Sequence, residues 1–181
     1  PHIAVEKSSQ RMIDILARNG ADVNASSPRL GGLLHSAAFF GDIATVENLL
    51  EFGADIHKQH VRMSHGSALH SACAGGHLDV VTLLLRKGAD VNLRIPSIDK
   101  KCGGYTPFLM AMPLNHCSSS GIEVCQILLS AGADPVAKSD AGETLLDIVE
   151  RAPEATNPFR AEQILFLSKV FKERDEAHRG E

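Results

Sequence analysis

Apolar side chains recur along the chain in short clusters at the spacing of a helix, with polar residues between them. The clusters are Met12, Ile13, Ile15 and Leu16; Val46, Leu49 and Leu50; Val80, Val81, Leu83, Leu84 and Leu85; and Val124, Cys125, Ile127, Leu128 and Leu129. Positions three and four apart share one face of a helix, so each cluster predicts an amphipathic helix. Helices this short must pack on neighbours to be stable.

A Gly-Ala-Asp turn follows each cluster. It begins at Gly20, Gly53, Gly88 and Gly132, at intervals of 33, 35 and 44 residues. A glycine at this place favours the left-handed backbone that ends a helix. A second anchor lies upstream of the last three turns and once after them. Its copies are Leu34-His35-Ser36-Ala37-Ala38, Leu69-His70-Ser71-Ala72-Cys73, Thr106-Pro107-Phe108-Leu109 and Thr144-Leu145-Leu146-Asp147. Each repeat therefore predicts two short helices, with Gly41 and Gly76 breaking the chain between them.

Together these anchors resemble the ankyrin repeat family, from about Pro1 to about Leu167. The resemblance implies an all-α fold: an ankyrin-repeat solenoid of stacked helix-turn-helix units with projecting hairpin or finger loops. It also implies structural roles for His35 and His70, whose rings would bond the helix start and the neighbouring turn, and for His77. Two copies depart from the family pattern, because Leu33 and Ala68 stand where the family usually has proline.

The spacing divides the chain into about five units. They are a partial first unit at 1–24, a second at 25–57, a third at 58–92, a fourth at 93–136, a capping unit at 137–174, and a frayed tail at 175–181. Insertions in the fourth unit fall in a finger at Leu93–Gly104 and between its two helices at Pro113–Ser119. The capping unit is predicted to have helices at Leu145–Ala152 and Phe159–Arg174. Because the first unit begins inside its first helix, we expect the array either to be truncated at its front or to continue before Pro1.

Composition narrows the class of protein. Of 181 residues, 44% are hydrophobic and only 4% are aromatic, which suits the thin core of a solenoid. The net charge of −4 argues against binding to nucleic acid or to an anionic membrane. No apolar run is long enough to span a bilayer. Four cysteines without a Cys-x-x-Cys pair are typical of an intracellular protein, cytoplasmic or nuclear.

The sequence favours neither catalysis nor metal binding. It lacks a phosphate-binding glycine loop and the common hydrolase motifs, so we expect no enzyme activity and no cofactor. His57, His60 and His65 gather on one finger, but an exposed trio is more often a solvated loop than a zinc site. Cys73 and Cys125 fall at apolar helix positions, which predicts two core thiols.

We therefore expect a monomeric protein-protein interaction module that binds another protein through its concave groove and finger loops. In the ankyrin family, contacts usually come from finger tips and from the exposed end of each first helix. The matching positions here are Phe39, Phe40, Pro28, Arg29, Met63, Tyr105 and Leu114. The Phe39-Phe40 pair carries most weight, since aromatic anchors dominate protein interfaces. The alternative for this pair is that one ring packs under the neighbouring finger.

A second function is compatible with the same residues. The array would then be a substrate-recruiting or regulatory arm of a larger multidomain enzyme. The repeat pattern alone does not separate the two functions, because fold does not determine function.

Overall fold

The computed structural model describes residues 15, 19–27, 31–60, 66–96, 103–112, 120–152 and 157–179. Its elements are short, as the apolar clusters predict. In chain order they are β1 (Ser26–Ser27), β2 (Gly31–Gly32), α2 (Leu33–Phe40), α3 (Ile43–Glu51), α4 (Ala68–Gly75), α5 (Leu78–Arg86), α6 (Gly121–Ser130), α7 (Leu145–Arg151) and α8 (Arg160–Arg179). Strands β1 and β2 pair antiparallel to form a small hairpin.

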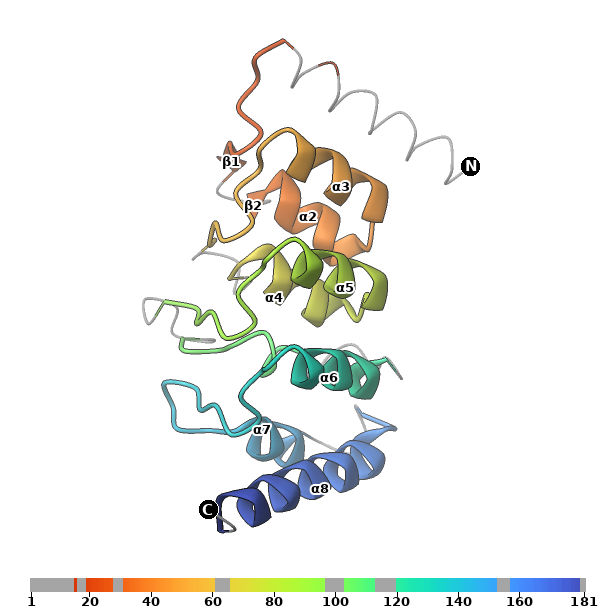
Figure 1. Ribbon diagram of the computed structural model, residues 1–181, viewed down its shortest axis with the longest axis vertical. Helices are drawn as coiled ribbons and strands as arrows, with labels where there is room; N and C mark the ends of the chain where they lie inside the picture. The colour runs from red at the N-terminus through yellow and green to blue at the C-terminus, as the bar shows by residue number, and fades with distance from the viewer. Residues whose placement is uncertain are drawn as a thin grey trace.

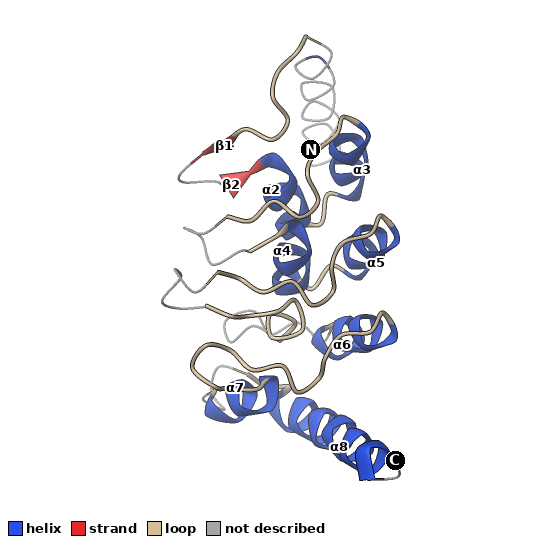
Figure 2. Cartoon of the chain, turned by 60° about the vertical axis from the view of Figure 1, so that its left-hand side comes forward, coloured by secondary structure: helices blue, strands red, loops and turns tan. Residues whose placement is uncertain are grey.

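The helices stack in two columns (Figure 1, Figure 2). The first helices of the units, α2, α4 and α7, form one column, and α3, α5 and α6 form the other, which α8 extends. The loops between units project as fingers from the side of the first column. The predicted all-α solenoid of helix-turn-helix units is therefore confirmed.

A thin apolar core lies between the two columns. The second helices contribute Val46, Leu49, Val80, Leu84, Val124 and Leu128, all 0% exposed. The first helices contribute small side chains, including Ala38, Ala72 and Cys73, which are also 0% exposed. Small residues let neighbouring helices pack closely, and this explains how so few aromatic rings fill the core.

Histidine ring nitrogens link α2 and α4 to the fingers that follow them. The Nε2–H of His35 donates to the carbonyl of Gly66 at 3.0 Å. His70 accepts from the Ser67 backbone N–H at Nδ1 (3.1 Å) and donates from Nε2 to the Tyr105 carbonyl (3.2 Å). The role implied for His70 is confirmed, because its ring bonds both the helix start and the neighbouring finger. For His35 the bonds to the finger are observed.

Asparagine side chains link the Gly-Ala-Asp turns of successive units. Asn24 donates to the Gly53 carbonyl at 3.1 Å and accepts from the Asp55 N–H at 2.7 Å. Asn92 repeats both bonds further along the stack, at 3.0 and 2.9 Å. At the boundary between them, His57 accepts the matching backbone N–H at 3.2 Å. The four turn glycines are left-handed as predicted, with φ between 82° and 89°.

The fourth unit does not form its predicted first helix. Residues 107–112 make turns and bends, held by bonds such as Met110 N–H to the Thr106 carbonyl at 3.2 Å. Proline explains the difference, because Pro113 disfavours helical backbone at the residue before it. Pro107 and Pro113 leave only a short stretch of residues between them, and this stretch forms turns rather than a helix.

The final helix also differs from its prediction. It begins at Arg160 and continues to Arg179, beyond the expected end at Arg174, so most of the predicted frayed tail is helical. Leu165, an apolar residue within the predicted helix, is 74% exposed. It lies two residues from both Gln163 and Leu167, which are buried, and two residues turn a helix to its opposite side.

Burial of His70 predicts a pH-dependent stability. Desolvation lowers its pKa from 6.5 to about 4, against the opposing bond to the Tyr105 carbonyl. Between these values the unfolded chain takes up a proton that the folded chain does not. The free energy of unfolding should therefore fall by about 3 kcal/mol as the pH drops from about 6.5 to about 4. Urea unfolding of the wild type and of His70→Asn across this range measures the effect, and an equal fall in both would contradict it.

Candidate functional site

Phe39 and Phe40 are the last two residues of helix α2, and their aromatic rings reach the solvent. The Phe40 side chain is 77% exposed, the highest value among the exposed large hydrophobic residues of the described chain. Its ring meets the Phe39 ring edge to face, with centroids 5.4 Å apart and planes at 83°. Aromatic pairs favour this arrangement, so each ring restricts the other.

The backbone beneath the pair is fixed to the next unit. The Nε2–H of His77 donates to the Phe39 carbonyl at 2.9 Å. Gly75 approaches the same carbonyl so closely that an added Cβ would lie 2.5 Å from it. The third unit has only Ala74 and Gly75 at the positions that match the two phenylalanines. No bulky side chain at those positions covers the Phe40 ring.

A tight turn follows Phe40 and places a second apolar residue beside it. Gly41 adopts φ +75°, and an added Cβ there would lie 2.5 Å from Nδ1 of His77. Asp42 then caps α3, accepting from the Thr45 backbone N–H at 3.0 Å. Ile43 begins α3 and is 37% exposed. Phe40 and Ile43 therefore flank one turn.

Hydrogen bonds hold the turns of three successive units in register. Beyond the bond from His77 to Phe39, the Ser120 hydroxyl donates to the Gly76 carbonyl at 3.0 Å. We call the surface formed by residues 39–43, 75–79 and 120–123 the turn edge. It lies at the opposite end of the first helices from the fingers.

The other predicted contacts do not lie on the turn edge. Tyr105 is half-buried in a finger, where its carbonyl accepts from the backbone N–H of Ile95 at 2.8 Å and from His70. This places it at the finger end of α4. Pro28, Arg29, Met63 and Leu114 lie outside the described residues. Which of these side chains contact a partner stays a prediction.

Neither the thiols nor the imidazoles of the described chain form a reactive group. Cys73 and Cys125 are buried, as predicted, and desolvation raises the pKa of both thiols. A thiol held protonated is a poor nucleophile. Within the described ranges, no three His, Cys, Asp or Glu side chains are placed to hold a metal ion. His60 instead lies edge to face against His35, with ring centroids 5.2 Å apart.

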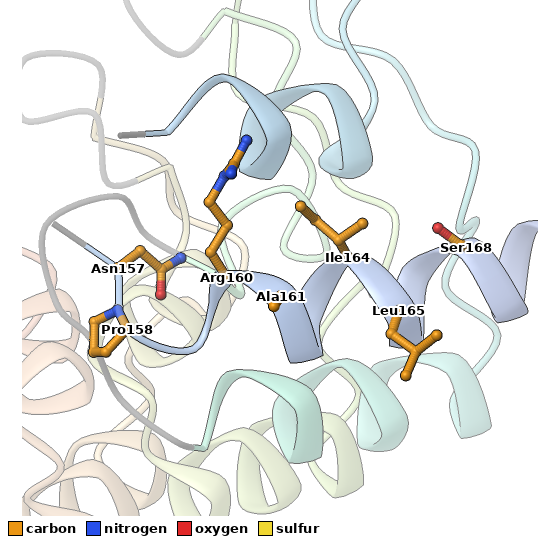
Figure 3. Close-up of a pocket in the computed structure, with 7 residues that line it drawn as sticks. All are labelled: Asn157, Pro158, Arg160, Ala161, Ile164, Leu165 and Ser168. Carbon is orange, nitrogen blue, oxygen red and sulfur yellow. The ribbon is translucent and has the colours of Figure 1, made fainter. Parts of the chain in front are cut away.

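Sequence reasoning missed two exposed apolar residues, Ile43 and Leu165. Ile43 precedes Val46 by three positions, so its spacing alone assigns it to the core stripe. Leu165 lines an open hollow of about 680 Å³ on α8 (Figure 3). There Arg160 and Ile164 point to the side of α7, and Leu165 points away from it. The Arg160 guanidinium bonds the Val149 and Glu150 carbonyls, so its charge is engaged within the fold.

The repeat geometry agrees with a comparison to known families. A family model described as ankyrin repeats, in three copies, matches residues 34–139. The match covers more than half of the chain, and the chain belongs to the ankyrin repeat family. A search of curated proteins found no significant match.

Membership of the family sets the general class of activity. Ankyrin repeats are generally protein-interaction modules, in which stacked units present an extended binding surface. Among the helices of the described residues, none is both long and apolar enough to cross a membrane.

The exposure of Phe40 predicts that folding does not depend on its ring. Phe40→Ser should change the free energy of unfolding by no more than about 0.5 kcal/mol, as for other exposed positions. Phe108 is 0% exposed, and Phe108→Ala should cost about 3–5 kcal/mol, because it empties a core site. Chemical denaturation of the two variants compares them. Equal destabilisation would show that the Phe40 ring is part of the core.

Proposed function

We propose that this chain is a protein-binding module that acts by holding a partner protein rather than by catalysis, and that the Phe39–Phe40 pair contacts the partner. The observation that carries the proposal is a large apolar ring, 77% exposed, next to a backbone carbonyl that is bonded to the following unit. Exposed apolar surface of this kind is typical of interaction sites.

Energetics support the same assignment. Covering the exposed ring of one phenylalanine is worth roughly 1.5–3 kcal/mol, which is enough to make it a leading contact. The edge-to-face contact with Phe39 and the bond from His77 hold the site before binding. A site held in advance loses less conformational entropy when the partner arrives.

We also propose where the protein acts and what it binds. We place the protein inside the cell, in the cytoplasm or nucleus, and the free thiols of Cys73 and Cys125 support this. We propose that the partner is another protein bound by a monomer of this chain. The fingers, including the one that carries Tyr105, would contribute further contacts.

A matched pair of variants tests the proposal. Phe40→Asp places a charge on the proposed contact, whereas Leu165→Asp places the same charge on α8, at a residue that is 74% exposed. Proteins captured from a cell extract by the wild type should be captured by Leu165→Asp and lost by Phe40→Asp. Circular dichroism should show equal helical signal for all three. Capture by Phe40→Asp at the wild-type level would refute the site.

A further inference from the structure

The turn edge combines its apolar residues with negative charge. Asp42 caps α3, Asp79 lies in the first turn of α5, and Glu123 lies in the first turn of α6. Asp79 and Glu123 are exposed, and Asp42 is half-buried.

No Lys or Arg side chain lies within the described segments of the turn edge. Neither α2 nor α4 has a basic residue in its last turn. The first turns of α3, α5 and α6 contain no Lys or Arg, and neither do the residues between the paired helices at 41–42 and 76–77. The exposed Phe40 ring therefore lies beside a surface of one sign.

The bonds from His77 to Phe39 and from Ser120 to Gly76 hold the three turns that carry these charges against one another. Asp42, Asp79 and Glu123 therefore lie at the starts of neighbouring stacked helices, on the same edge of the fold as the Phe40 ring.

We infer that the turn edge docks a partner segment with one large apolar side chain for Phe40 and Ile43, and with Lys or Arg side chains beside it for Asp42, Asp79 and Glu123. This inference rests on the proposed function and names the chemistry of its partner. An acidic segment would be repelled by the same three carboxylates, because like charges oppose each other across an interface.

A peptide selection tests this chemistry even while the partner is unidentified. A displayed library of random 12-residue peptides is selected on the purified wild type, on Phe40→Asp and on Leu165→Asp. The wild type and Leu165→Asp should enrich peptides that contain a large apolar residue flanked by Lys or Arg. Phe40→Asp should not enrich them.

The most enriched peptide is then synthesised and its Kd measured by fluorescence anisotropy. The triple variant Asp42→Asn, Asp79→Asn and Glu123→Gln should bind it about 5-fold or more weakly, as expected for the loss of three surface charge pairs. Asparagine also caps helices, so α3 keeps its start. A matched triple, Glu51→Gln, Glu150→Gln and Glu162→Gln, removes the same charge elsewhere and should bind like the wild type.

The outcomes separate this inference from the proposed function. Enrichment that depends on Phe40 but yields neutral or acidic peptides would overturn the inference and leave the proposed function standing. Equal affinity of the two triple variants would do the same. Enrichment that is identical on Phe40→Asp, or no enrichment on any of the three proteins, would count against both.

Discussion

The structure depends on hydrogen bonds that cross from each helix pair to the next. A helix of eight or nine residues is marginal in water, and its apolar stripe is buried only when another pair lies against it. Imidazoles make the crossing at both ends of the first helices: His35 and His70 at the finger end, and His77 at the turn end. Asn24 and Asn92 add the same kind of link between the outer turns.

The exposed aromatic pair follows from this constraint. Close stacking requires Gly75 beneath the Phe39 carbonyl and Gly41 beside the His77 ring. The residues that allow the two turns to meet leave little side chain around Phe40, so the ring stands clear of its own fold. The stacked helices therefore hold the apolar Phe40 side chain in solvent. The acidic residues at the neighbouring helix starts give the same surface a negative charge.

Much of this could be predicted from the sequence, because repeat spacing reports a backbone geometry that every unit shares. The left-handed glycines, the buried Cys73 and the ring bonds of His70 all follow from position within the repeat. Residues that break the repeat could not be placed this way. Residues 107–112 form turns where the repeat pattern predicts a helix, and Leu165 lies on the side of α8 opposite to the buried Gln163 and Leu167. The exposure of a side chain depends on which residues of the neighbouring helix pair cover it. The spacing of apolar residues within one segment does not reveal this.

The central claim is that the turn edge, rather than the finger side alone, contacts the partner. Hydrogen–deuterium exchange of the chain, free and saturated with a captured partner, tests this most directly, because backbone amides report where solvent is excluded. We expect slower exchange at residues 39–44 and 77–80 in the complex. Slower exchange confined to the fingers, with no change at these residues, would contradict it.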